Sequence, residues 1–116
     1  MSPERDWRFR IQDMLDAILA IQEYTRGMSF ESFQNDPKTV DAVIRRLMVI
    51  GEAASHIPED IALSAPTIEW RRIRGMRNVI VHEYFGVSDK ILWETVQGDL
   101  PSIVIPLQQL IVSSRD

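Results

Sequence analysis

The residues best suited to chemistry lie in one short stretch, between Arg71 and Tyr84. Arg71, Arg72, Arg74 and Arg77 fall within seven positions, followed by Asn78, His82 and Tyr84 in an Arg-Asn-x-x-x-His-x-Tyr run. An imidazole transfers protons near neutral pH, a guanidinium presents a planar fork of donors that suits phosphate, and an amide can orient either group. A base, a phosphate clamp and a positioning amide are what RNA cleavage by its own 2′-hydroxyl needs, and that reaction requires no metal.

Helical spacing brings part of this set together. At 100° per residue, Asn78 and His82 lie about 40° apart on one face, whereas Arg77 lies about 140° from His82. Other roles are nevertheless commoner for such residues. A histidine near a helix end usually caps it, neighbouring arginines usually form a solvated face, and a tyrosine is usually half-buried. Spacing alone therefore leaves catalysis as a minority interpretation.

The composition indicates one soluble domain over residues 1–116. The chain has no cysteine, which excludes disulfides and thiolate zinc sites. Its polar N-terminus lacks a signal-peptide core, and no apolar run approaches the roughly 20 residues of a membrane span. We therefore expect a cytoplasmic protein without membrane contact. A net charge of −4 argues against nonspecific DNA coating but leaves room for a local cationic site.

Apolar residues recur at three- and four-residue steps through most of the chain, and no convincing strand pattern interrupts them. The predicted helices run over residues 3–26, 37–57, 68–82 and 89–113, with one short turn at 61–63 and a link at 28–35. Ser2, Asp36, Thr67 and Ser88 are the predicted N-caps, and Gly27 is a predicted C-terminal stop. Pro101 and Pro106 should kink or split the last helix. The pattern predicts an all-α bundle of four or five helices.

The chain resembles the HepT-like toxins of the HEPN superfamily. Arg77-Asn78-x-x-x-His82-x-Tyr84 matches their Arg-x4-His-x-Tyr signature. Similar blocks span nearly the whole sequence: 42–47, 50–54, 70–78, 82–87 and 99–101. Pro106 is an extra interruption relative to the family pattern and leaves the shape of the last helix in doubt.

This resemblance implies a metal-independent endoribonuclease without a cofactor, acting as a homodimer whose protomers share a cleft. Arg77 and His82 would be the catalytic pair, with Asn78 supporting them. It further implies a toxin–antitoxin pair of the type VII kind. The partner would be a cognate MntA-type nucleotidyltransferase antitoxin that transfers AMP to Tyr84 and silences cleavage.

The resemblance also suggests supporting residues around the cleft. Arg71, Arg72 and Arg74 would contact RNA, and Arg46 and Glu52 would support the catalytic residues. Glu52 and His56 lie one turn apart and could share a metal ion, but no third ligand is evident. A Glu52 that positions an arginine across two helices is the preferred interpretation.

A non-enzymatic alternative comes from a different class of function. In it, the helical dimer binds a nucleotide or scaffolds a nucleotidyltransferase, and the arginines recognise phosphate without cleaving anything. The nuclease is favoured because a bare structural dimer needs neither His82 nor Tyr84.

Overall fold

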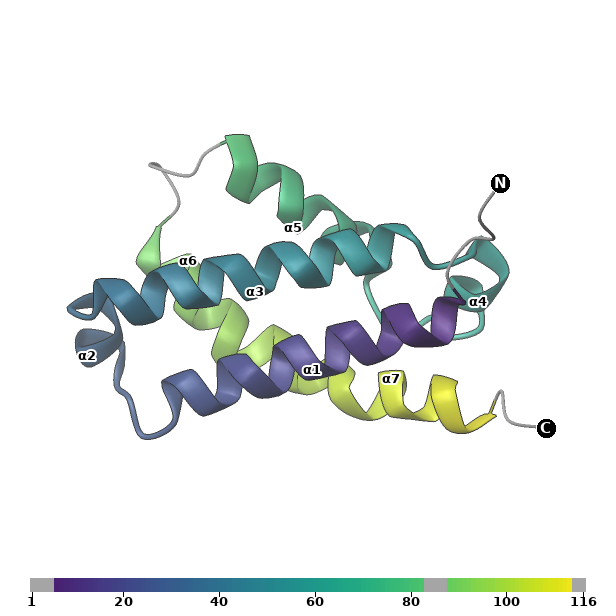
Figure 1. Cartoon of the computed structure of the whole chain (residues 1–116), viewed down its shortest axis with the longest axis horizontal. Helices are drawn as coiled ribbons and strands as arrows, with labels where there is room; N and C mark the ends of the chain where they lie inside the picture. Colours follow the sequence, from purple (N-terminus) through teal and green to yellow (C-terminus); the bar gives the residue numbers. More distant parts are fainter. Residues whose placement is uncertain (1–5, 83–87, 114–116) are drawn as a thin grey trace.

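The computed structural model describes residues 6–82 and 88–113, with the backbone alone for residues 79–82. Within these ranges the chain is helical and contains no strand, which confirms the all-α prediction (Figure 1). The elements are α1 (Trp7–Thr25), α2 (Phe30–Gln34), α3 (Pro37–Ser55), α4 (Glu59–Leu63), α5 (Trp70–His82), α6 (Asp89–Glu94), the π-helical turn η2 (Thr95–Asp99) and α7 (Leu100–Ser113). Because α6, η2 and α7 follow one another directly, the described residues form six helical stretches. The sequence predicted four or five, and the number differs because α2 forms in the segment expected to be a link.

Capping side chains set several of the predicted boundaries. The Asp36 carboxylate accepts from the backbone N–H of Thr39, and Pro37 opens α3. The Ser88 hydroxyl accepts from the backbone N–H of Lys90 at the start of α6. Gly27 follows α1 with φ of 75°, the left-handed conformation that glycine adopts without a steric penalty. These three predictions are confirmed.

The start of α1 was predicted wrongly. The helix begins at Trp7, because the Asp6 carboxylate accepts from the backbone N–H of Arg8 and so provides the N-cap. The predicted cap Ser2 and first helical residue Pro3 lie outside the described residues.

The segment expected to link the first two long helices contains a short helix, α2. Ser29 and Ser32 form a reciprocal capping box, in which each side chain accepts from the other's backbone N–H. Phe33 is fully buried and stacks at 5.2 Å against Trp93 of α6. Burial of this one ring explains why a five-residue helix forms where the sequence shows no periodicity.

α5 begins two residues later than predicted, at Trp70. Thr67 does not cap it, because Ile68 still belongs to a turn in which its N–H donates to the Ala65 carbonyl. The indole N–H of Trp70 donates to the same carbonyl at 3.2 Å. This buried anchor fixes where the chain enters α5.

The last helix changes to a π-helical turn, Thr95–Asp99, just before the first of the two prolines that were predicted to kink or split it. The backbone N–H of Leu100 bonds to the Thr95 carbonyl, five residues back, so the chain widens into one π-helical turn before Pro101. Pro106 lies inside α7, which nevertheless continues to Ser113.

Apolar faces of the long helices form a common core. α1 lies beside α3, with α5 and α7 on either side of this pair (Figure 1). The predicted stripe of α1 is buried: Ile11, Met14, Leu15, Ile18 and Ile21. Ile91, expected in the stripe of the last helix, is instead 60% exposed. No helix in the described part of the chain is long and apolar enough to cross a membrane.

Candidate functional site

The Arg-x4-His stretch lies in the C-terminal half of α5. Arg77 and Asn78 have exposed side chains on this helix. The helical backbone continues through His82, so it places His82 one turn after Asn78, as predicted. Tyr84, the predicted modification site, lies outside the described residues.

A glycine allows α3 and α5 to approach closely at this point. A Cβ atom built on Gly51 would lie 2.9 Å from Cβ of Arg77 and 3.1 Å from its backbone nitrogen. Real side chains do not tolerate such contacts, so any larger residue at position 51 would push the two helices apart. The backbone of Arg77 therefore packs directly against α3.

Glu52, the next residue on α3, holds the Arg77 side chain. Its Oε2 atom lies 3.1 Å from Nε of Arg77 in an ion pair that joins the two helices. Its Oε1 atom shares a 3.1 Å hydrogen bond with Nε2 of His56, one turn further along α3. The preferred interpretation of Glu52, a carboxylate positioning an arginine across two helices, agrees with this geometry.

The charges around Glu52 favour its ionised form. The pKa of its carboxyl lies below the ordinary value of 4.5, first because His56 hydrogen-bonds to it and then because of the positive charge of Arg77. Arg10 contributes a smaller effect of the same sign. Glu52 is therefore ionised at neutral pH and can maintain its ion pair with Arg77.

Arg77 and Glu52 border a groove of about 380 Å³ between α1, α3 and α5. Two further arginines line it, Arg10 from α1 and Arg45 from α3. Neither was selected from the sequence. Arg45 could have been found, because it lies seven residues before Glu52 and hence within about 20° of it on the same helix. Arg10 carries no such signal, since its place depends on how α1 packs against α3.

Arg74 does not reach this groove. Its Nε donates to the Ala54 carbonyl at 3.0 Å and its Nη2 to the Ile57 carbonyl at 3.3 Å. Carbonyls at the end of a helix lack intrahelical partners, so Arg74 acts as a side-chain cap for the end of α3. Glu59 lies 3.5 Å from the same guanidinium.

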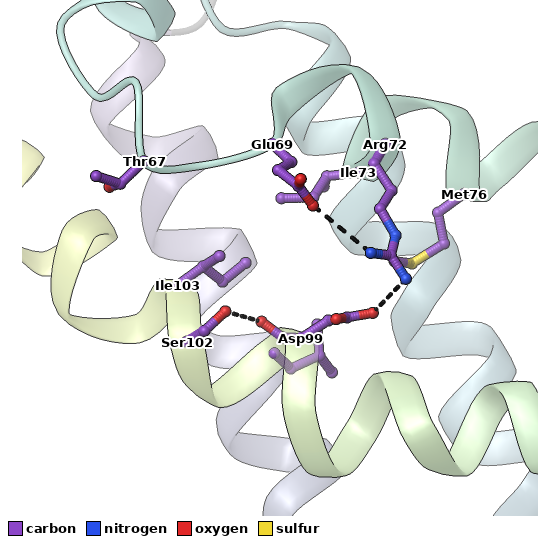
Figure 2. Close-up of a pocket in the computed structure, with 9 residues that line it drawn as sticks. Thr67, Glu69, Arg72, Ile73, Met76, Asp99, Ser102 and Ile103 are labelled. Carbon is purple, nitrogen blue, oxygen red and sulfur yellow. Dashed lines mark hydrogen bonds and ion pairs between the residues drawn. The ribbon is translucent and has the colours of Figure 1, made fainter.

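Arg72 points to a different hollow, between α5 and α7. Figure 2 shows its guanidinium between two acidic side chains, with Nη2 at 2.8 Å from Asp99 and Nη1 at 3.5 Å from Glu69. This pocket of about 250 Å³ also has apolar walls, including Ile73, Met76 and Ile103. The structure thus separates Arg72 from Arg77, while Arg71 is exposed on the surface of α5.

Arg46, predicted to support the cleft, contacts α1 instead of α5. Its Nε donates to the Tyr24 hydroxyl at 3.3 Å, and its guanidinium carbon lies 5.9 Å from the centre of that ring. The neighbouring hollow is shared with Arg45 and Val49, which also border the groove of Arg77. Arg46 is therefore next to the site rather than in it.

The residues that the structure describes contain no group of three His, Asp or Glu side chains arranged to hold a metal ion. Within the groove, both oxygens of Glu52 are engaged, one by His56 and one by Arg77. The charged groups of the groove are accordingly three guanidinium groups and the carboxylates of Asp13 and Glu52, and guanidinium groups are suited to binding phosphate.

Comparison with known proteins supports the family that the Arg-x4-His-x-Tyr motif suggests. The sequence profile of the family described as "Ribonuclease HepT-like" matches residues 14–110. The chain is 44% identical over 100 residues to "Probable ribonuclease HepT" of Thermococcus cleftensis, covering 86% of this chain and 91% of the relative. It is 35% identical over 109 residues to "Putative RNase MJ0127" of Methanocaldococcus jannaschii, covering 94% and 90%. No solved structure matches significantly. On the extent of these matches, the chain belongs to the HepT-like ribonuclease family of the HEPN superfamily.

Proposed function

We propose that this protein is an endoribonuclease that cleaves RNA by attack of the 2′-hydroxyl on the adjacent phosphodiester, with Arg77, His82 and Asn78 at the reacting centre. The observation that carries the proposal is the Glu52–Arg77 ion pair at the edge of an arginine-lined groove. It holds a guanidinium at the edge of a groove lined by two further arginines, in a chain whose relatives are named ribonucleases.

The proposed reaction needs only the RNA, water and the side chains of the protein. His82 accepts the proton of the 2′-hydroxyl as the bond between O2′ and phosphorus forms. The bond between phosphorus and O5′ breaks, and the 5′-oxygen leaves as a hydroxyl by taking a proton from water. The protonated His82 then releases its proton to the solvent, which restores the base. The products are a 2′,3′-cyclic phosphate and a free 5′-hydroxyl. Arg77 stabilises the negative charge that grows on the phosphoryl oxygens, and Asn78 orients the phosphate or the imidazole.

A homodimer would complete the site. Helical geometry sets positions 77 and 82 about 140° apart around one helix, so a single protomer brings Arg77 and His82 together poorly. Two copies facing each other across the C-terminal half of α5 would let the arginine of one protomer act with the histidine of its partner. Light scattering should then give about twice the 13.4 kDa mass of one chain. A protein that is entirely monomeric at micromolar concentration would contradict the proposal of a cleft shared by two protomers.

The decisive experiment is RNA cleavage by the purified protein in EDTA. We expect cleavage to leave 2′,3′-cyclic phosphate ends. His82→Ala and Arg77→Ala should each lower the rate by about 10²-fold or more, the usual loss for an acid–base or charge-stabilising group. Cleavage by His82→Ala at the wild-type rate would refute the mechanism. Tight nucleotide binding with no cleavage at all would favour the alternative, a non-catalytic nucleotide-binding or scaffolding module.

Regulation by a nucleotidyltransferase antitoxin is part of the same proposal. Transfer of AMP to Tyr84 would add negative charge close to Arg77 in the sequence and repel the phosphates of RNA. A Tyr84→Phe variant should keep most of its cleavage rate and escape silencing when incubated with the cognate enzyme and ATP. Intact-mass measurement supplies the check, since full inhibition with Tyr84 unmodified would show that the partner blocks the site sterically.

A further inference from the structure

Three arginines from three different helices line the groove of about 380 Å³: Arg10 of α1, Arg45 of α3 and Arg77 of α5. The acidic residues on the same walls are Asp13 and Glu52. Three guanidinium groups against two carboxylates leave the groove with a local charge of +1, in a chain whose net charge is −4. An anion that approaches this acidic protein therefore finds a cationic opening here.

Two of the three arginines in the Arg71–Arg74 stretch are engaged in contacts that stabilise the fold. Arg72 is paired with Asp99 and Glu69, and Arg74 binds carbonyl oxygens at the end of α3. Releasing either side chain to bind RNA would leave carboxylates or carbonyl groups without their partners, at a cost in stability. In the Arg71–Arg74 stretch only Arg71 is both exposed and outside these contacts, so the stretch offers a ligand less positive charge than its sequence suggests.

Arg10 has a donor atom without a partner in the described part of the chain. This atom, Nε, is buried and makes no hydrogen bond there. A buried donor without a partner is unfavourable, and a reorientation of the side chain breaks no hydrogen bond at Nε. Arg45, which lines the groove from α3, has an exposed side chain. Both arginines can therefore adjust to a phosphate between them.

We propose that Arg10 and Arg45 form a second phosphate-binding site, in which the groove holds a neighbouring phosphate of the RNA strand while Arg77 acts on the phosphate that is cleaved. This inference rests on the proposed nuclease function and specifies the path of its substrate. The RNA crosses α1 and α3 and leaves the Arg71 side of α5 uncovered. Positively charged grooves that follow the backbone are the usual way in which proteins bind single strands without reading sequence.

The test is the salt dependence of binding to a single-stranded 2′-O-methyl oligoribonucleotide, which has no free 2′-hydroxyl and cannot be cleaved. For single strands, the slope of log K against log salt falls by about 0.7 for each phosphate that the protein no longer neutralises. Arg10→Ala and Arg45→Ala should each reduce the slope by about that amount. Arg10→Lys should retain it, because the charge is kept.

Arg26→Ala is the matched control, since Arg26 at the end of α1 is paired locally with Glu23 and lies outside the groove. It removes the same charge and should leave the slope unchanged. Arg71→Ala tests the competing path along α5. A reduced slope for Arg71→Ala, with wild-type slopes for both groove variants, would overturn the inference. Thermal unfolding of each variant shows whether it is folded, and the exposed Arg45 provides a second variant if Arg10→Ala does not fold.

Failure of this inference and failure of the nuclease proposal give different results. A protein that binds the oligonucleotide through Arg10 and Arg45 but leaves RNA uncut retains the phosphate site and loses the nuclease function. A protein that cuts RNA with salt slopes independent of both arginines retains the nuclease function and loses the second site.

Discussion

The two faces of α5 place the same kind of residue in opposite settings. On the face toward α7, Arg72 lies between Asp99 and Glu69, so two carboxylates surround one guanidinium (Figure 2). On the face toward α3, Arg77 is paired with Glu52, and Arg10 and Arg45 share its groove. The first setting neutralises the arginine and joins two helices. The second orients the arginine and keeps an excess of positive charge for a ligand.

The largest expected difference between the two faces is in catalysis. Arg77→Ala should lower the rate of RNA cleavage by about 10²-fold or more, because in the proposed mechanism this guanidinium stabilises the reacting phosphate. Arg72→Ala should lower it by far less than Arg77→Ala, since the Arg72 guanidinium is already occupied by acidic partners. Initial rates on one RNA substrate measure both. Equal losses for the two variants would contradict the distinction drawn between the faces.

The next effect tests the close approach of α3 and α5. Gly51→Ala places a methyl group against Arg77 and should cost about 1–3 kcal/mol of unfolding free energy, as overpacking usually does. Gly75→Ala, on α5 itself, has nothing within 4 Å of the new Cβ and should instead stabilise the helix by up to about 1 kcal/mol. Urea denaturation of the pair gives the comparison. A Gly51→Ala variant as stable as the wild type would show that the helices can separate freely.

Removing the acidic partner of Arg77 or of Arg72 tests the difference between the two faces of α5. Glu52→Gln releases Arg77 and should lower kcat on the order of tenfold, because small displacements of a catalytic group are costly. Asp99→Asn should leave kcat nearly unchanged and lower the unfolding free energy by about 0.2–1 kcal/mol, the usual range for an exposed ion pair. Steady-state kinetics and denaturation separate the two outcomes. Loss of kcat in Asp99→Asn alone would reverse the roles assigned to the two pockets.

The smallest effect is the pH dependence of the Glu52 contacts. The pKa of Glu52 in the folded state lies below its ordinary value of 4.5, so the carboxylate contributes stability above pH 4.5. That contribution is lost as the pH falls through the lower folded-state pKa. The wild type should exceed Glu52→Gln in unfolding free energy by no more than about 1 kcal/mol at neutral pH, because the side chain is 45% exposed. Denaturation at pH 7 and pH 3 should show the difference shrinking in acid; an increase in acid would contradict the assigned sign.

Local signals predicted much of the secondary structure. The caps of α3 and α6 are interactions between residues two or three positions apart, and the end of α1 depends on the conformation of Gly27 itself. Such local signals are visible in the sequence. Two of the errors arose where the packing of an aromatic side chain decided the outcome. α2 forms because Phe33 stacks on Trp93, and the chain before α5 stays in a turn held by the Trp70 indole.

The sequence by itself determined the helical class, the family and the identity of Arg77, Asn78 and His82 as candidates. Periodicity and local caps encode helices, and the motif is a linear pattern. Tertiary structure alone decided which arginines meet which partners. Arg72 reaches an acid 27 positions away, Arg74 reaches carbonyls at the end of α3, and Arg10 joins Arg77 from another helix. A helical sequence specifies which residues share a face of a helix. Which other helix packs against that face depends on the tertiary structure. Here α5 can pack closely against α3 because Gly51 has no side chain.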